Sequence, residues 1–143
     1  MTDQKLAPYA ATVLRIALGV MFIAHALLKI IVFTPEGTAQ FFSAVGLPAS
    51  LAPFTIGIEL IGGVMLVLGV YTRWVSLALI PVLVGSILFV HGAAGWVFSN
   101  ENGGWEYPAF LIAASFVQAL LGDGAYALKF KRAVFTPVAA SAS

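Results

Sequence analysis

Four long apolar segments, separated by short stretches rich in glycine, proline and polar residues, limit most strongly how this chain can fold. They cover about residues 8–33, 53–70, 74–98 and 105–121. A helix needs about 20 apolar residues to cross the hydrocarbon core of a bilayer, within a range of about 17–25. Membrane-spanning strands would have to close into a barrel, and these segments lack the alternation that a barrel requires. The pattern therefore predicts an all-α membrane protein, a bundle of four transmembrane helices.

The composition agrees with lipid as the solvent and excludes several classes of function. Hydrophobic residues make up 61% of the chain and charged residues 9%, whereas a soluble domain carries about 25% charged residues. Because there is no cysteine, the chain has no disulfide, iron–sulfur ligation or thiol relay of its own. The net charge of +1 provides no electrostatic footprint for nucleic acid. We expect one membrane domain over residues 1–128 and a tail over residues 129–143 that is basic at first and then flexible.

The basic residues outside the apolar segments predict the orientation in the membrane. They are Lys5, Arg73, Lys129, Lys131 and Arg132. The connections over residues 34–52 and 99–104 contain glutamate but neither lysine nor arginine. By the positive-inside rule, both termini and the turn at Arg73 are cytoplasmic, so we expect a multi-pass protein of the inner (plasma) membrane. Part of the long first connection, residues 39–48, is expected to form a short interfacial helix that ends near Gly46 and Pro48.

Six ionisable residues lie within the apolar segments, where a charged side chain costs about 2.5–3.5 kcal/mol at the helix centre. They are Arg15, His25, Lys29, Glu59, His91 and Glu106. In the predicted topology all of them except Arg15 fall in the outer half of the membrane, together with Tyr107. Arg15 lies toward the cytoplasmic side and is expected to extend to the headgroups there. The depth of Glu59 and its short side chain predict that it has a partner inside the bundle.

Helical periodicity predicts that several of these residues converge. His25 and Lys29 are four residues apart, which places them about 40° from each other on one helix face. One face of the 53–70 helix combines Glu59 with small residues that permit close approach of a neighbouring helix, namely Thr55, Gly62 and Gly63. We expect a buried polar cluster in which Glu59 and Glu106 neutralise Lys29. The alternatives are that Lys29 extends to the outer headgroups, that His91 and Glu106 lie at the water boundary, and that the tryptophans belong to an aromatic belt.

Such a cluster has the groups that a quinone site requires, because a quinone needs hydrogen-bond donors at its carbonyls and a proton source when it is reduced. The candidate quinone or substrate site comprises His25, Lys29, Glu59, His91, Trp105, Glu106 and Tyr107. Haem is a weaker alternative, with His25 and His91 as axial ligands from two helices. No spacing indicates a metal site. The same polar seam could instead let a small solute permeate.

A series of motifs resembles the DoxX family over nearly the whole chain, about residues 14–128. In order, they are "LRIALGVMFIAHALLKI", "GLP", "IELIGGVMLVLGVYTRW", "FVHGAAGW", "GGWEYP" and "LLGDGAYAL". The family's polar pattern falls on His25, Lys29, Glu59, Arg73, His91, Glu106 and Tyr107. These residues form the shared polar core of the family, without an assigned catalytic residue.

The resemblance implies a small four-helix protein of the inner membrane. The family takes its name from the small-subunit type of an archaeal thiosulfate:quinone oxidoreductase, and other members are linked to membrane oxidoreductase complexes and to thiol or oxidative-stress handling. The expected function is therefore a membrane subunit of a quinone-linked oxidoreductase, with a partner protein, surrounding lipid and a homo-oligomer as candidate associations. A solute transporter and a non-catalytic scaffold for a partner protein are the alternatives.

Overall fold

The computed structural model of the chain describes residues 4–129, and every regular element in that range is helical. The elements are α1 (Ala7–Leu27), the π-helical turn η1 (Leu28–Val32), α2 (Pro35–Ala44), α3 (Leu51–Leu68), α4 (Thr72–Ser86), the π-helical turn η2 (Ile87–His91), the short 3-10 turn η3 (Gly92–Ala94) and α5 (Glu106–Leu121). The all-α fold class is thus confirmed for the described residues. The predicted flexible end of the tail, with Lys131 and Arg132, lies outside them.

Within the described part of the chain, three helical stretches are long and apolar enough to cross a membrane: Ala7–Val32, Leu51–Leu68 and Thr72–Ala94. The fourth expected span is the apolar helix α5, which has 16 residues and is shorter than the others. The third span was expected to continue to residue 98, but its last helical turn ends at Ala94. Gly95 follows with a φ of 82°, a positive value that glycine adopts readily and that does not continue a helix.

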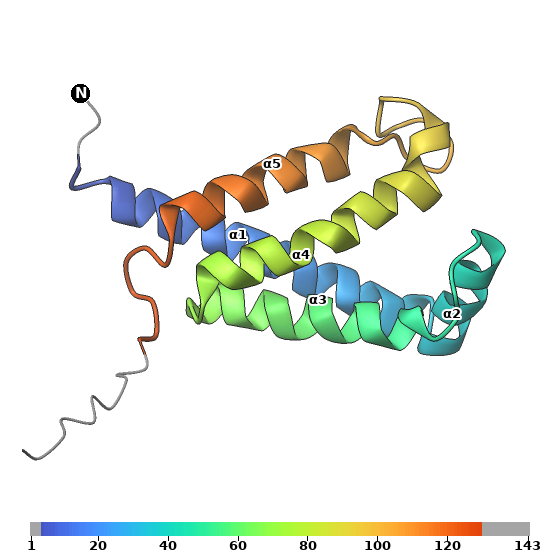
Figure 1. The fold of residues 1–143 in the computed structure, drawn as a ribbon, viewed down its shortest axis with the longest axis horizontal. Coiled ribbons are helices and arrows are strands. Elements are labelled where there is room, and N and C mark those ends of the chain that lie inside the picture. The colour runs from blue at the N-terminus through green and yellow to red at the C-terminus, as the bar shows by residue number, and fades with distance from the viewer. Residues whose placement is uncertain (1–3, 130–143) are drawn as a thin grey trace, which may run out of the picture.

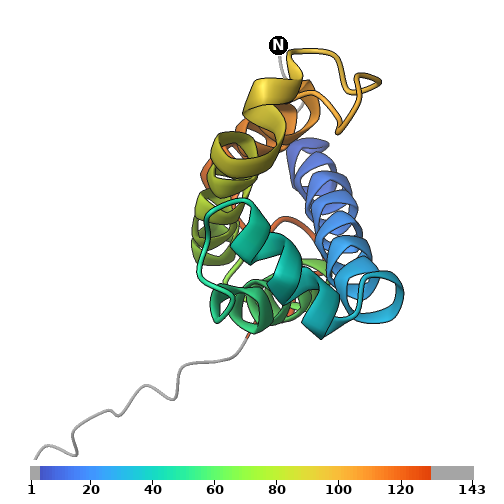
Figure 2. The same ribbon diagram turned by 90° about the vertical axis from the view of Figure 1, so that its right-hand side faces the viewer.

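The helices form two packed pairs. α1 lies mainly against α3, and α4 lies mainly against α5, while α3 and α4 are joined by a tight turn (Figures 1 and 2). α2 packs on α3 and crosses one end of the bundle, where the loop between η3 and α5 also lies; we call this the α2 end. The other end, which we call the terminal end, holds both described ends of the chain, because Ala125 N donates to Pro8 O at 3.0 Å.

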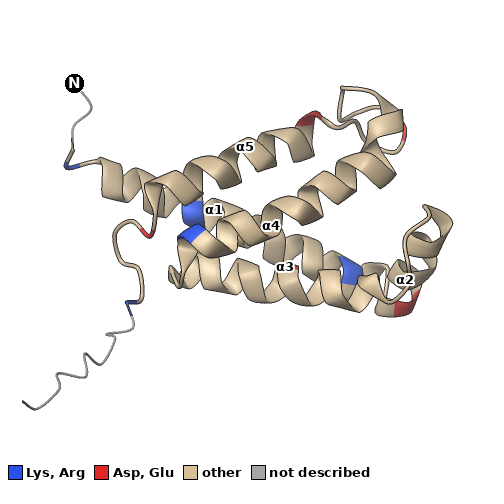
Figure 3. Ribbon diagram, in the orientation of Figure 1, with Lys and Arg blue, Asp and Glu red and all other residues tan. Residues whose placement is uncertain are grey.

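The charged residues divide between these two ends. Most of the basic residues lie at the terminal end, and most of the acidic residues belong to α2, the loop and the start of α5 (Figure 3). The exceptions are Lys29 in η1, Glu59 in α3 and Asp123 just after α5. This distribution accords with the charge asymmetry from which the orientation was predicted.

Two glycines face each other where α1 crosses α3. A methyl group at Gly19 would lie 2.7 Å from the Gly63 carbonyl oxygen, and one at Gly63 would lie 2.8 Å from the Gly19 carbonyl oxygen. On the same face of α3, a methyl group at Gly62 would lie 3.2 Å from Leu79 of α4. The expectation that the small residues of this face admit neighbouring helices is therefore confirmed. The backbones of α1 and α3 touch because neither helix carries a side chain at this point.

Gly19→Ala is accordingly expected to lower the free energy of unfolding by about 1–3 kcal/mol, because the added methyl group forces apart two backbones that cannot adjust independently. Gly57→Ala in α3 is the matched control, since no atom lies within 4 Å of its added methyl group. The control should be neutral or stabilising by up to about 1 kcal/mol through helix propensity. Unfolding by titration with SDS in mixed micelles measures both changes, and equal effects at the two positions would contradict this account of the crossing.

The short helix of the first connection occupies a different register from the expected one. It was expected over residues 39–48 but begins at Pro35 and ends at Ala44. Its start is fixed by Thr34, whose hydroxyl oxygen accepts from Gly37 N at 3.1 Å, and by Pro35 in the first helical turn, where a missing N–H costs nothing. Gly46, with a φ of 88°, follows the helix end, as the glycine signal indicated.

Arg15 corrects another expectation. Its side chain was expected to extend to the cytoplasmic headgroups, but the residue is only 1% exposed. Nη1 donates to Leu66 O at 3.0 Å and to Val67 O at 2.8 Å, and Nη2 donates to Ala125 O at 3.1 Å. The carbonyls of the last helical turn have no partners within the helix and carry a partial negative charge. Arg15 therefore caps α3 and holds the segment after α5 against it.

Candidate functional site

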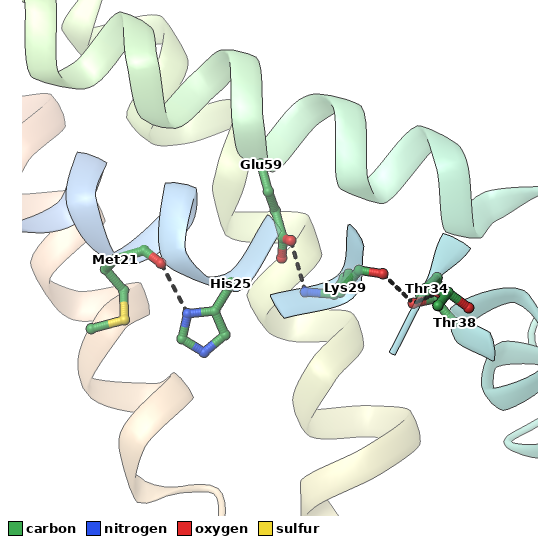
Figure 4. Close-up of polar contacts among 6 residues, drawn as sticks. All are labelled: Met21, His25, Lys29, Thr34, Thr38 and Glu59. Carbon is green, nitrogen blue, oxygen red and sulfur yellow. Dashed lines mark hydrogen bonds and ion pairs between the residues drawn. The ribbon is translucent and has the colours of Figure 1, made fainter. Parts of the chain in front are cut away.

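A buried ion pair joins the first and third helices of the chain near the α2 end. Lys29 Nζ, from η1, lies 2.7 Å from Glu59 Oε2 of α3, and Figure 4 shows the two side chains reaching toward each other. The Glu59 side chain is 6% exposed and that of Lys29 is 19% exposed. The expected partner for Glu59 is thus Lys29, and Lys29 does not extend to the headgroups. The pair satisfies both charges where water has little access.

The backbone around Lys29 is itself held in place. η1 is a π-helical turn, in which Phe33 N donates to Leu28 O at 3.0 Å, and such turns recur at functional positions in helices. The Thr38 hydroxyl, from α2, lies 3.2 Å from Lys29 O and 2.9 Å from Thr34 O (Figure 4). Thr38 is 3% exposed. This buried contact links α2 to the turn that presents the ammonium group.

His25 lies one turn before Lys29 but faces a different neighbour. Its ring points away from Glu59 in Figure 4 and lies alongside the ring of Tyr107 in α5, with ring centroids 6.3 Å apart and planes inclined by 24°. His25 Nδ1 lies 2.9 Å from the carbonyl oxygen of Met21. A carbonyl oxygen can only accept, so Nδ1 carries the hydrogen, and in the neutral ring Nε2 has a free lone pair.

Tyr107 completes this group of side chains. Its hydroxyl donates to Met21 Sδ, a weak acceptor. Tyr107 is 39% exposed and His25 is half-buried, so both rings are accessible from the outer surface of the bundle. Met21, His25 and Tyr107 together form what we call the α1–α5 site. It offers two aromatic surfaces and one unoccupied nitrogen lone pair at the side of the bundle.

The remaining candidate residues lie around the loop between η3 and α5: His91 is the last residue of η2, Trp105 ends the loop and Glu106 begins α5. His91 Nδ1 donates to Asn102 O at 3.1 Å and to Gly103 O at 2.9 Å. Trp105 packs edge-on against Trp96, with ring centroids 4.5 Å apart and planes at 81°. His91 thus holds the loop against η2, and the tryptophan pair holds the two ends of the loop together.

Glu106 belongs to the same loop structure. Its Oε1 accepts from Phe98 N at 2.8 Å, and its own N–H donates to Trp96 O at 3.0 Å. The expectation that Glu106 neutralises Lys29 is therefore wrong, because its carboxylate is bound to the loop backbone, and Glu59 is the acidic residue among residues 4–129 that pairs with Lys29. A glutamate at the first position of a helix is also favoured there by the helix dipole.

The predicted cluster is thus divided into three groups: the Lys29–Glu59 pair, the α1–α5 site and the loop. His25 and His91 belong to different groups, with different hydrogen-bond partners, which gives no support to the haem alternative. Sequence reasoning missed Met21 and Thr38. Met21 could have been noticed because it precedes His25 by four residues, the spacing at which a helical histidine reaches a backbone carbonyl. Thr38 carries no comparable signal, since its contact depends on how α2 folds back.

The chain is similar in sequence to a protein family and to two bacterial proteins. A family model described as DoxX matches residues 10–92. A Bacillus subtilis protein named "Putative oxidoreductase CatD" is 36% identical over 115 residues, which make up 80% of this chain and 81% of that protein. A Haemophilus influenzae protein named "Uncharacterized protein" is 33% identical over 103 residues, 71% of this chain and 75% of that protein. No solved structure matches the chain at a significant level.

Proposed function

The chain belongs to the DoxX family of membrane proteins, and on that premise we propose that it is a membrane subunit of a quinone-linked oxidoreductase, with the α1–α5 site as the place where the quinone binds. The relative whose name includes "oxidoreductase" supports the reaction class. Electrons would pass between the quinone and a partner protein, with reduced sulfur compounds or oxidants as candidate substrates of the assembly. The site residues are proposed to bind and orient the quinone.

One observation carries the proposal: a half-buried histidine with one nitrogen fixed and the other free lies alongside a tyrosine at the lipid-facing side of the bundle. Nδ1 is held by Met21 O at 2.9 Å, which fixes the orientation of the ring. The neighbouring Tyr107 is 39% exposed and supplies an aromatic surface and a hydroxyl group. An apolar ligand dissolved in the bilayer can reach these groups from the side, without passing through water. A quinone has the matching features, a flat ring with polar oxygens at its edge.

The proposed setting is the inner (plasma) membrane, crossed four times, with both described chain ends on the cytoplasmic side. α5 is shorter than the other spans, but it is apolar and packs against α4. The N-terminal part of α1 and the segment after α5 are joined by the bond from Ala125 N to Pro8 O, and this shared end carries Arg73 and Lys129. Cysteine labelling from either side of the membrane, at Ser99 and at Lys129, tests the orientation.

Replacing His25 by phenylalanine should weaken binding of the quinone in its reduced, hydroxyl-bearing form about tenfold or more, because the ring contact with Tyr107 can persist while the Nε2 acceptor is lost. Equilibrium dialysis of a short-chain hydroquinone against protein in nanodiscs under anaerobic conditions, corrected with empty nanodiscs, measures the affinity. Val20→Phe is the control, since Val20 is 56% exposed on α1 and lies on another face of the helix. Equal affinity in the His25→Phe variant and the unmodified protein would exclude the α1–α5 site, and no binding by either would exclude the function.

The Lys29–Glu59 pair supports a second role, that of a scaffold for a partner protein. The pair and the contact from Thr38 to Lys29 O fix three elements, η1, α2 and α3, relative to one another. In this reading the pair sets the packing of the α2 end and takes no part in binding quinone. Glu59→Gln should then lower stability while the affinity for quinone, measured in the folded fraction, is unchanged. Crosslinking in native membranes that recovers no partner protein would count against the scaffold role.

A further inference from the structure

In its neutral form, the His25 ring offers a ligand of the α1–α5 site a hydrogen-bond acceptor and no donor. His25 Nδ1 is the only ring nitrogen with a hydrogen in the neutral imidazole, and it donates to Met21 O. Nε2 therefore presents a lone pair and no hydrogen. No other described residue makes a hydrogen bond to Nε2 in the structure. A ligand that approaches this nitrogen is bound through a hydrogen that the ligand itself provides.

Lys29 and Tyr107, the polar neighbours of His25, do not change the requirement that a ligand donate a hydrogen to Nε2. Lys29, one turn along the chain, directs its ammonium group to Glu59 at 2.7 Å, on the side of the helix away from the His25 ring (Figure 4). The Tyr107 hydroxyl donates to the Met21 sulfur, and since a thioether is a weak acceptor, this hydroxyl can turn toward a ligand. Tyr107 can then donate to a carbonyl or accept from a hydroxyl. Tyr107 therefore serves either kind of ligand, and His25 serves only one.

We infer that the α1–α5 site selects the hydroxyl-bearing form of its ligand, a hydroquinone or a related phenol, whose O–H donates to Nε2 of His25. This inference rests on the proposed function and adds to it which redox form the resting site holds. The oxidised quinone has only carbonyl oxygens at its ring and would place an acceptor against the Nε2 lone pair. Two acceptors facing each other repel and leave both groups without partners. The discrimination between the two forms therefore resides in His25.

Two ligand pairs test this selection in nanodiscs under anaerobic conditions. The first pair is trimethylhydroquinone and trimethylbenzoquinone. The second is an alkylphenol and its methyl ether of the same chain length, which removes the hydroxyl hydrogen without any redox chemistry. We expect the hydroxyl form of each pair to bind about tenfold more tightly than its partner, after correction for partition into empty nanodiscs, as the loss of one well-oriented hydrogen bond predicts.

Variants of His25 and Tyr107 test whether the preference for the hydroxyl form comes from Nε2 of His25. His25→Asn retains an amide donor near the position of Nδ1 and removes the acceptor at Nε2, so the preference should fall to less than about twofold. His25→Gln places an amide oxygen near Nε2, so part of the preference should return. Tyr107→Phe should weaken both members of each pair to a similar extent. Far-UV circular dichroism and gel filtration establish that each variant is folded before its affinities are compared.

The outcomes separate this inference from the function on which it rests. Preference for the hydroxyl form that is lost in His25→Asn and partly restored in His25→Gln supports the inference. Equal binding of both forms, tighter binding of the quinone or the ether, or a preference that persists in His25→Asn overturns it while leaving a quinone site in place. Absence of binding by all four ligands overturns the proposed function and the inference together.

Discussion

Lys29→Met is expected to lower the free energy of unfolding by about 3–5 kcal/mol. The substitution leaves the Glu59 carboxylate, 6% exposed, without the ammonium group that lies 2.7 Å away in the native protein. An uncompensated charge inside the bundle is far more costly than the loss of the attraction alone, since neither water nor another described side chain can replace the partner. Titration with SDS in mixed micelles, followed by tryptophan fluorescence, measures the change.

The double variant Lys29→Met with Glu59→Met is the decisive control. It removes both charges together and fills similar volumes with apolar atoms, so most of the lost stability should return. A double-mutant cycle built from the two single variants then gives the coupling between the residues. Additive losses in the cycle would mean that the pair is not energetically coupled, and the structural account of the α2 end would have to be abandoned.

Arg15→Met is expected to have the second large effect, a loss of about 3 kcal/mol. The guanidinium group donates to the carbonyls of Leu66 and Val67 at 2.8–3.0 Å and to that of Ala125 at 3.1 Å. Methionine removes these three charge-assisted bonds and leaves Val67 O without its partner, whereas Leu66 O keeps Gly69 N and Ala125 O keeps the Thr12 hydroxyl. Buried acceptors that lose a partner each cost about 1–3 kcal/mol. The same micelle titration measures the total loss of stability.

Hydrogen exchange locates the effect of Arg15→Met within the chain. The amides of Ala125 and Leu128 donate to Pro8 O and Leu68 O, each at 3.0 Å, and should exchange faster in the variant because the segment after α5 is released. Arg15→Lys should be intermediate, because a lysine keeps the charge near the end of α3 but cannot span the same acceptors with a planar fork. Unchanged exchange at Ala125 in Arg15→Met would show that Arg15 does not anchor this segment.

The helices were predictable from the sequence because apolar length and glycine or proline punctuation act locally. The start of α5 at Glu106 and the end of α3 before Gly69, which has a φ of 77°, follow from such signals. The predicted boundaries were wrong at two places, one set by a capping side chain and the other by a glycine within the apolar segment. Thr34 caps α2 earlier than the expected start, and Gly95 ends the third helical stretch four residues before the expected end.

The candidate site was only partly predictable, for a geometric reason. The spacing of His25 and Lys29 placed them on one face of α1, and the structure agrees that they lie on successive turns. That face, however, borders two neighbours: Lys29 reaches α3 and Glu59, while His25 lies against Tyr107 of α5. A periodic pattern gives the angle between two residues on a helix and contains no information about which helices pack on either side of it.

The sequence by itself determined that this chain forms apolar helices in a membrane, that its few ionisable residues needed partners, and that small residues on α3 allowed close packing. Those properties follow from composition and from periodicity along one helix. The tertiary structure decided which partners were chosen: Glu59 for Lys29, helix-end carbonyls for Arg15, and the loop backbone for Glu106. Partner choice depends on distances between helices that are far apart in sequence, and these distances are set only when the whole bundle packs.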